Sequence, residues 1–367
     1  MFADIYFGKR VLVTGHTGFK GSWLTFWLSR LGAQVFGLAL HPDTRPCHFQ
    51  LLDLPIQSVF ADIRDIRALV KAIQAIQPDI VFHLAAQPLV RRSYRKPVET
   101  FATNVMGTIH LYEACRKLDA VRAIVTITSD KCYENKEWVW GYRENDPMGG
   151  FDPYSASKGC AELMTASYRR SYFDLDQYGI THHTLVATAR AGNVIGGGDW
   201  GEDRLIPDIA RATAKQRPVI LRNPSAIRPW QHVLDPLSGY LLLGQKLLEG
   251  KKNHADAYNF GPSPDNSMTV KQVAQQFKVH WSDMTYELHS DNDQPHEAGL
   301  LRLDCARANS LLNWRPVWDS SLSLEKTAVW YKQYYSKSKV LTHQDFEDYT
   351  LTAYGKKMCW ITNSSGQ

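Results

Sequence analysis

The feature that most constrains the fold is a short apolar run that breaks into a glycine-rich turn and continues as an amphipathic stretch. Val11-Leu12-Val13 predicts a buried strand, and a helix is expected from the turn to Leu31, before Gly32 ends it. The turn between them has the spacing G-x-x-G-x-x-G, with glycines at Gly15, Gly18 and Gly21. Such glycines allow a tight turn, close approach of the backbone to a pyrophosphate, and packing of the helix on the strand. The sequence therefore predicts a dinucleotide site near the N-terminus.

Strand and helix patterns alternate through the first half of the chain. Strands are expected at 34–40, 58–60, 80–84 and 123–128, and helices at 63–75, 104–118 and 154–178. Because this alternation requires crossover connections, it predicts an α/β fold with a doubly wound parallel sheet of Rossmann type. The 367 residues are many for one such unit. We expect a Rossmann domain with the catalytic residues at 1–190, a smaller and mainly substrate-binding part at 191–335 that returns some chain to the core, and a tail at 336–367 without an assigned role.

Composition excludes several classes of protein. The net charge of +5 comes from scattered basic residues, which fits an anionic small molecule better than nucleic acid. The sequence shows neither a signal segment at its start nor an apolar run of membrane-spanning length, so we expect a soluble, cytoplasmic protein without a membrane partner. The six cysteines form no C-x-x-C pair and no cluster with histidine, which indicates reduced thiols and no metal site.

The candidate catalytic residues follow the fifth expected strand and begin the next helix. Tyr154 and Lys158 are four residues apart and share one helix face. We expect the Lys158 ammonium to lower the pKa of the Tyr154 phenol, so that with Ser129 it can take a hydroxyl proton while a hydride leaves for nicotinamide. An isolated Y-x-x-x-K pattern would more often be an ordinary surface pair. Asp130 and Lys131 add an acid and a base, although they could instead form an ion pair, and a water-relayed base is also open.

Together these motifs resemble the extended short-chain dehydrogenase/reductases that act on nucleotide sugars, over at least residues 8 to 320. The residues that carry the resemblance are Gly15, Gly18, Gly21, Asp62-Ile63-Arg64, Leu84-Ala85-Ala86-Gln87, Asn104, Ser129, Tyr154 and Lys158. The resemblance implies that Asp62 pairs with the adenine amine, that Ile63 packs on the adenine, and that Leu84 to Ala86 pass the pyrophosphate. The expected cofactor-binding residues are Gly15, His16, Thr17, Gly18, Phe19, Lys20, Gly21, Asp62, Ile63, Leu84, Ala85, Ala86, Tyr154 and Lys158.

Within that family the 4,6-dehydratases carry Thr or Ser, then Asp, then Glu after the fifth strand, whereas this chain has Lys131 at the third position. With the segments 190–200 and 228–232, this substitution is similar to the CDP-glucose 4,6-dehydratases. The resemblance implies CDP-glucose as substrate and bound NAD that is regenerated in each cycle. Lys131 is the expected base at carbon 5, and Asp130 the expected acid for the 6-hydroxyl. It further implies a homodimer and a role in deoxysugars of bacterial surface polysaccharide, such as lipopolysaccharide O-antigen.

The cofactor site departs from the family pattern. Ala39 stands about where NAD-preferring relatives have an acidic residue, and His16 and Lys20 replace small and apolar residues in the turn. Asp43 or Thr44 could substitute for the missing acid, while Arg45 leaves NADP open. We expect NAD, bound less tightly than in relatives.

Substrate contacts are expected mostly in the second half. The candidates are Gln87, Ser129, Asn193, Arg204, Leu205, Arg228 and Arg302. Arg228 and Arg302 are candidate pyrophosphate clamps because guanidinium forks match phosphate oxygens, although either could be a surface arginine. Two alternatives remain at this point: a nucleotide-sugar 4-epimerase, which needs the same Ser, Tyr and Lys but no acid and base, and a dinucleotide-sensing scaffold without turnover.

Overall fold

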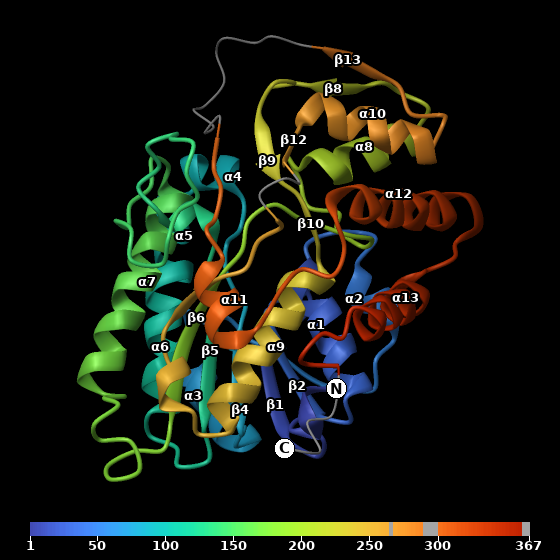
Figure 1. Ribbon diagram of the computed structural model, residues 1–367. Coiled ribbons are helices and arrows are strands. Elements are labelled where there is room, and N and C mark those ends of the chain that lie inside the picture. Colours follow the sequence, from blue (N-terminus) through green and yellow to red (C-terminus); the bar gives the residue numbers. More distant parts are fainter. Residues whose placement is uncertain (264–266, 289–299, 362–367) are drawn as a thin grey trace.

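A seven-stranded parallel sheet forms the centre of the protein (Figure 1). The computed structural model describes residues 1–263, 267–288 and 300–361. The strand order is β11-β6-β5-β4-β1-β2-β3, and every neighbouring pair is parallel. The strands are β1 (Arg10–Thr14), β2 (Gln34–Ala39), β3 (Gln57–Phe60), β4 (Ile80–His83), β5 (Ala123–Ile127), β6 (Leu185–Arg190) and β11 (Ala257–Asn259). The predicted α/β fold with a doubly wound parallel sheet is confirmed.

Apolar side chains are buried on both faces of this sheet. In β1, Val11 and Val13 belong to the cluster that includes α1 and α9, whereas Leu12 belongs to the cluster that includes α3 and α6. The helices around the sheet are α1 (Phe19–Arg30), α2 (His48–Leu52), α3 (Ile66–Ile76), α4 (Val90–Arg95), α5 (Pro97–Phe101), α6 (Gly107–Cys115), α7 (Pro153–Ser171), α9 (Leu234–Leu248), α11 (Ala306–Leu312) and α13 (Thr342–Gly355). Short helical turns are η1 (Phe2–Asp4), η3 (Asp130–Cys132) and η4 (Lys252–His254), with a π-helix η2 (Ala102–Met106) before α6.

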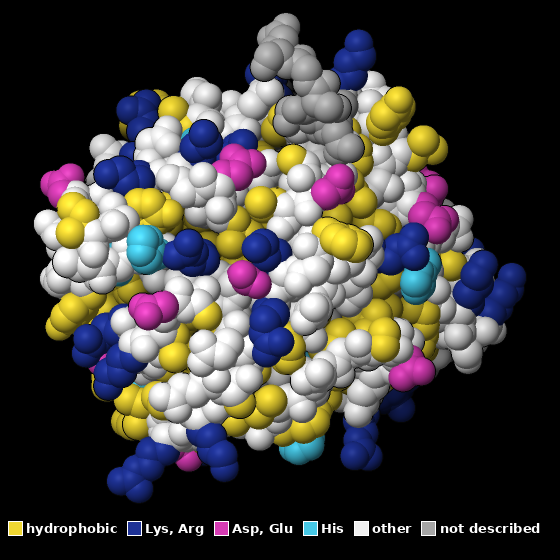
Figure 2. All heavy atoms as spheres, turned by 90° about the horizontal axis from the view of Figure 1, so that it is seen from below, with side chains coloured by type: hydrophobic (Ala, Val, Ile, Leu, Met, Phe, Trp, Pro, Cys, Tyr) yellow, Lys and Arg dark blue, Asp and Glu magenta, His cyan; other side chains and the backbone are white. Residues whose placement is uncertain are grey.

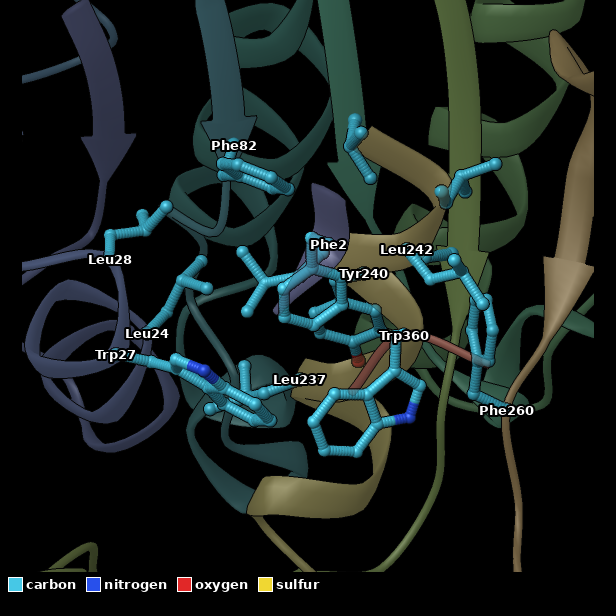
Figure 3. Packing of buried hydrophobic residues seen from close by; sticks show 14 of the residues in the cluster. Phe2, Leu24, Trp27, Leu28, Phe82, Leu237, Tyr240, Leu242, Phe260 and Trp360 are labelled. Carbon is cyan, nitrogen blue, oxygen red and sulfur yellow. The ribbon is translucent and has the colours of Figure 1, made fainter. Parts of the chain in front are cut away.

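The two ends of the described chain meet in the larger hydrophobic cluster. Phe2 stacks on Trp360 with ring centroids 5.3 Å apart, and both rings contact Trp27 of α1 (Figure 3). Phe346 and Tyr349 of α13 lie in the same cluster. The C-terminal stretch, for which the sequence suggested no role, therefore contributes side chains to the main core.

A second group of elements lies above the sheet in Figure 1 and has a hydrophobic cluster of its own. It comprises β7 (Val194–Ile195), α8 (Leu205–Ala214), β8 (Val219–Leu221), β9 (Ile227–Pro229), β10 (Gln231–His232), β12 (Ser267–Thr269), α10 (Val270–His280), β13 (Tyr286–Leu288) and α12 (Ser320–Lys337). We call it the upper lobe. Between its segments the chain returns to the sheet through α9 and β11. The upper lobe therefore faces the end of the sheet where the turns after β1, β5 and β6 lie.

Three helices differ in length from the sequence expectation. The helix expected at 104–118 is the π-helix η2 followed by α6, which ends at Cys115. The helix expected from residue 63 begins at Ile66, because the Asp65 side chain accepts the backbone N–H groups of Arg67 and Ala68 as an N-cap. The helix expected to residue 178 ends at Ser171, and the buried Phe173 ring anchors the chain directly after it. No helix among the described residues is long and apolar enough to cross a membrane.

Candidate active site

The glycine-rich turn brings the start of α1 close to the ends of β1 and β4. Gly15 has φ +74°, and a Cβ there would lie 2.8 Å from the Ala85 nitrogen. A Cβ on Gly21 would lie 2.1 Å from the Gly15 carbonyl oxygen. Only glycine fits these two positions, so the first turn of α1 can approach a ligand through its backbone N–H groups. This cradle fits the pyrophosphate of a dinucleotide.

The side chains of the turn point in different directions. His16 is fully buried between strands, where its Nε2 lies 3.0 Å from Ser58 Oγ and its ring lies against Gly37. Burial lowers the pKa of His16 to about 4, so the ring is neutral. The structure thus places the His16 side chain in the core, and only its backbone is available to a cofactor.

Lys20 points toward the catalytic residues instead. Burial lowers the pKa of its ammonium to about 8, while the neighbouring Asp130 charge raises it and the Lys158 charge lowers it. Thr17 donates its hydroxyl to the Leu40 carbonyl at 3.1 Å, which ties the turn to the end of β2. Ala39, at that end, is buried, so no carboxylate stands there.

The residues expected around the adenine and pyrophosphate are partly engaged within the protein. Asp62 forms an ion pair with Arg64 at 2.5 Å, and this pair holds the pKa of the Asp62 carboxyl below its usual range. Ile63 is buried against Gly107 at the start of α6, which leaves little of its side chain for a ligand. The Ala85 N–H donates to the Thr14 hydroxyl at 3.2 Å, so the segment from Leu84 to Ala86 lies directly beside the glycine-rich turn.

Gln87 does not point into a site. Its amide donates to the Thr100 hydroxyl at 2.9 Å and its carbonyl accepts the Leu89 N–H at 2.7 Å, while the Gln87 N–H donates to Asn104 Oδ1 at 2.8 Å. The polar groups of Gln87 are thus all bonded to neighbouring residues, and Gln87 connects the segment after β4 to the π-helix. The sequence expectation of a substrate contact gains no support from this geometry.

The turn after β5 and the start of α7 bring the candidate catalytic residues together. Ser129 caps η3 by accepting the Lys131 N–H at 3.2 Å, and it donates to Asp130 Oδ1 at 2.9 Å. Tyr154 and Lys158 are only 8% and 7% exposed, and Lys158 Nζ donates to the Ile127 carbonyl at 3.3 Å. A serine hydroxyl, a phenol and an ammonium thus meet at the carboxyl end of β5.

The electrostatics of Tyr154 differ from the sequence expectation. Burial raises the pKa of its phenol to about 12, against the lowering effects of a hydrogen bond with Ser129 and of the Arg204 charge. Burial also lowers the pKa of Lys158 to about 8. The predicted net depression of the Tyr154 pKa by Lys158 is therefore not present in this structure, because desolvation outweighs the neighbouring positive charges.

Asp130 and Lys131 do not form the ion pair that their adjacency allowed. Asp130 is almost fully buried, and among the described residues its Oδ2 has no hydrogen-bond partner. A Cβ on Gly192 would lie 2.0 Å from that oxygen, so the absence of a side chain at this position makes room for the carboxylate. Lys131 is half-buried. The acid and the amine remain available as separate groups.

The substrate candidates fall into two places. Arg204 is the residue directly before α8, which begins at Leu205, and it pairs with Asp199 at 2.8 Å. Its charge lies close enough to Tyr154 to lower the phenol pKa. The half-buried Asn193 follows β6 on the same side of the sheet. Arg302, by contrast, lines a cavity of about 650 Å³ with Arg315 and Lys356, and neither Ser129 nor Tyr154 contributes to its wall.

Arg228 lies in β9 of the upper lobe and is half-buried. Its Nη1 donates to the Ile227 carbonyl at 3.0 Å, and β9 pairs with β12 through Arg228 and Met268. The structure thus places Arg228 on the lobe and not among the catalytic residues.

Sequence reasoning overlooked the polar residues behind the site. Glu162 is buried four residues after Lys158, and it pairs with Arg190 at 2.8 Å. The i, i+4 spacing from Lys158 was a signal that could have identified Glu162. The partner from β6 could not be assigned, because its contact depends on how the sheet and α7 pack. Among the described residues no group of histidine, cysteine and acidic side chains could hold a metal ion.

The family of the chain follows from comparison with known proteins. Residues 12–327 match the model of the GDP-mannose 4,6 dehydratase family. The chain belongs to this family. A member from Salmonella typhimurium, described as CDP-glucose 4,6-dehydratase, is 49% identical over 93% of this chain and 96% of its own length. The resemblance to nucleotide-sugar 4,6-dehydratases that the motifs predicted is therefore confirmed.

More distant relatives agree on the fold. A UDP-glucose 4-epimerase from Mycoplasma pneumoniae is 24% identical over 90% of this chain and 98% of its own. The solved structure of epimerase Mth375 from Methanothermobacter thermautotrophicus superposes with a TM-score of 0.79 at 24% identity, over 94% of this chain and 96% of that one. A Thermus thermophilus UDP-glucose 4-epimerase, solved in complex with NAD, gives 0.75 at 24% identity and covers 88% and 98%. At this identity the solved structures establish the shared α/β architecture.

Proposed function

We propose that this protein is a CDP-glucose 4,6-dehydratase, which converts CDP-glucose to CDP-4-keto-6-deoxyglucose and water. The observation that carries the proposal is that two further groups lie next to the buried Ser129, Tyr154 and Lys158. They are Asp130, whose Oδ2 has no hydrogen-bond partner among the described residues, and the half-buried Lys131. A 4-epimerase needs only Ser129, Tyr154 and Lys158. The 49% identity to a protein described as a CDP-glucose 4,6-dehydratase supports the choice of nucleotide.

The cofactor that we propose is NAD. The cradle at Gly15 and Gly21, the N-terminus of α1, the neighbouring segment from Leu84 to Ala86 and the Tyr154 and Lys158 pair would hold it. Bound NAD supplies the acceptor and later the donor of one hydride, so it is unchanged after each cycle. Because Ala39 replaces an acid and Asp62 is paired with Arg64, we expect NAD to bind less tightly than in relatives with that acid.

In the first step the chain's own residues prepare the 4-hydroxyl of the sugar for oxidation. Tyr154 takes the hydroxyl proton, Ser129 hydrogen-bonds the oxygen, and the Arg204 charge stabilises the phenolate. In our proposal the Lys158 ammonium, one helical turn further along α7, adds to this stabilisation. Since burial holds the pKa of Tyr154 at about 12, proton uptake by the phenolate is strongly favoured once it forms. The carbon 4 ketone that results acidifies the proton on carbon 5.

In the second step water is eliminated. Lys131 removes the carbon 5 proton, and Asp130 gives a proton to the 6-hydroxyl, which departs as water and leaves a double bond between carbons 5 and 6. Addition of hydride at carbon 6 and of a proton at carbon 5 then gives the 4-keto-6-deoxy sugar. The buried position of Asp130 keeps bulk water away from the leaving group.

In our proposal the nucleoside diphosphate part of the substrate binds between the sheet and the upper lobe. Arg204 and Leu205 at the start of α8, with Asn193 and Arg228, would bind it there, and Arg302 would bind a phosphate oxygen from the cavity that it lines. The boundaries proposed for the catalytic and substrate parts, 1–190 and 191–335, place these residues mainly in the second part. Figure 2 shows Lys and Arg side chains spread among acidic and apolar ones over the lower face, which is unlike a nucleic-acid surface.

Mass spectrometry of CDP-, UDP-, dTDP- and GDP-glucose incubated with the purified protein and NAD tests the proposal. We expect CDP-glucose alone to lose one water, without net release of reduced nicotinamide. Interconversion of glucose and galactose donors, which leaves the mass unchanged and is read by chromatography of the released sugars, would favour the epimerase. Absence of turnover with all four donors, together with NAD binding, would favour the sensing scaffold.

We further propose a homodimer in the cytoplasm that supplies deoxysugars for bacterial surface polysaccharide, such as O-antigen. Large apolar side chains are exposed on α5, η2 and α7, including Val98 at 82% and Leu163 at 60%. Sedimentation analysis should give a dimer for the native chain and a monomer for Leu163→Glu. The six free cysteines fit a reducing compartment.

A further inference from the structure

Helix α7 carries a third buried ionisable side chain on the face that holds the catalytic pair. Tyr154, Lys158 and Glu162 are spaced four residues apart, so they follow one another along the helix. Glu162 is only 4% exposed. Neither step of the proposed reaction uses it, and an ionised carboxylate is costly to bury unless other groups pair with it.

The Glu162 carboxylate is held by both strands beneath the helix. The Thr128 hydroxyl donates to Oε1, while Thr188 Oγ1 and Arg190 Nη2 each donate to Oε2 at 2.8 Å. Burial alone would raise the pKa of this carboxyl, but the Arg190 charge and the hydrogen bonds bring it below its ordinary value. Glu162 is therefore an ionised group in a fixed position.

Lys158 and Glu162 are bound by two consecutive residues, Ile127 and Thr128. The Lys158 Nζ donates to the Ile127 carbonyl, and the Thr128 side chain binds Glu162. Arg190 is held on its other side, because its Nη1 donates to the Tyr133 hydroxyl at 2.6 Å and to the Glu144 carbonyl at 2.9 Å. The arginine thus neutralises part of the Glu162 charge from the side of β6, and Lys158 lies about one helical turn before Glu162 on α7.

We propose that Glu162 is a positioning residue for the oxidation step, whose buried carboxylate keeps the Lys158 ammonium charged and in place beside Tyr154. This inference rests on the proposed function. Burial lowers the pKa of Lys158 to about 8, and the Glu162 charge is the main effect that opposes this lowering. Without that charge the amine would lose its proton closer to neutral pH, and with it the positive charge that stabilises the phenolate.

The titration of Lys158 has to be distinguished from the titrations of the groups around it. These groups are Tyr154 and Glu162 on α7, Cys132 on η3, His83 on β4 and Lys20 on α1. Burial lowers the pKa of His83 to about 3 and raises that of Cys132 well above its usual range, so both are neutral near pH 8. Lys20 also titrates near pH 8, but Glu162 is not among the charges that shift it. A change at residue 162 therefore reports on Lys158.

The experiment measures the pKa of Lys158 directly, from the ¹³Cε resonance in lysine-labelled protein, assigned by its loss in Lys158→Met. In Glu162→Gln we expect this pKa to fall by about one unit. The matched control Thr188→Val removes a hydrogen bond to the same carboxylate but keeps its charge, and should leave the Lys158 pKa close to the native value. The double variant E162Q/R190M removes both charges and so avoids an unpaired buried arginine. Because the arginine charge opposes that of Glu162, the fall in the Lys158 pKa should be smaller in this variant than in Glu162→Gln.

In each Glu162 variant the apparent pKa of the high-pH limb of kcat/KM for CDP-glucose should fall by as much as the Lys158 pKa falls in that variant. An unchanged Lys158 pKa in both Glu162→Gln and the double variant would make Glu162 a structural brace and overturn the inference, whatever happens to activity. Because the titration needs no substrate, failure of CDP-glucose to react would count against the proposed function and not against the role of Glu162.

Discussion

At the scale of single residues, the proposed oxidation and elimination depend on different side chains and can be separated. Tyr154→Phe should abolish both steps, because a phenyl ring cannot take the hydroxyl proton. Asp130→Asn should still oxidise the sugar but stall before water leaves, since an amide of equal size cannot donate the proton. Lys131→Met should also block exchange at carbon 5. A single-turnover reaction in deuterated water distinguishes the two steps in each variant. Nicotinamide absorbance reports oxidation, and deuterium at carbon 5 reports proton removal.

Normal exchange at carbon 5 in Lys131→Met would contradict the assignment of the base. In that case a water molecule would be the next candidate, and Lys131 would serve only as a neighbouring charge.

Gly192 allows a second prediction at this scale. A Cβ at residue 192 would overlap Asp130 Oδ2, so Gly192→Ala should displace the acid at a cost of about 2 kcal/mol, or roughly thirty-fold in the elimination step. Oxidation should be retained. Gly355→Ala is the matched control, because a Cβ there has no atom within 4 Å. Equal losses of oxidation and elimination in Gly192→Ala would indicate general damage instead of a displaced carboxylate.

At the scale of helices and strands, local patterns predicted most of the sheet and the part of the site that lies on it. The five strands from β1 to β5 and the Tyr154 and Lys158 pair depend on spacing within a few residues, which a sequence displays directly. The ion pair between Glu162 and Arg190 joins α7 to β6, and the His16 side chain can be buried only because Gly37 leaves space for its ring. Such contacts form between elements, so no local pattern predicts them.

The start of α7 offers a test of how one cap affects both stability and the site. Asp152 accepts the Ser155 N–H at 2.9 Å and is the N-cap next to Tyr154. Asp152→Ala should lower the free energy of unfolding by about 1 kcal/mol and should also reduce kcat, because the first turn that orients the phenol loosens. Asp319→Ala removes the equivalent cap of α12 in the upper lobe. Urea unfolding should show a similar loss there, with kcat retained.

At the scale of the whole molecule, buried polar residues join parts that are far apart in the sequence. Asp235 at the start of α9 accepts the Val317 N–H at 2.6 Å and the Tyr349 hydroxyl of α13 at 2.9 Å. The C-terminal stretch is polar overall, so its sequence does not indicate that it contributes to the core. The side chains that it buries there are single aromatic rings such as Trp360. A sequence shows these residues but not the distant partners that bury them.

Asp235 should make the stability of the whole protein depend on pH. Burial raises the pKa of its carboxyl to about 7, against about 3.9 in an unfolded chain. Between these values the folded protein binds one proton more than the unfolded one, so stability should fall as pH rises from about 4 to about 7 and then level off. Asp235→Asn should therefore gain up to roughly 4 kcal/mol at pH 8 relative to the native chain and little at pH 4. Urea unfolding across this range measures the difference, with the exposed Asp283→Asn as control. A constant difference at every pH would show that Asp235 is ionised in the folded protein and would contradict the prediction.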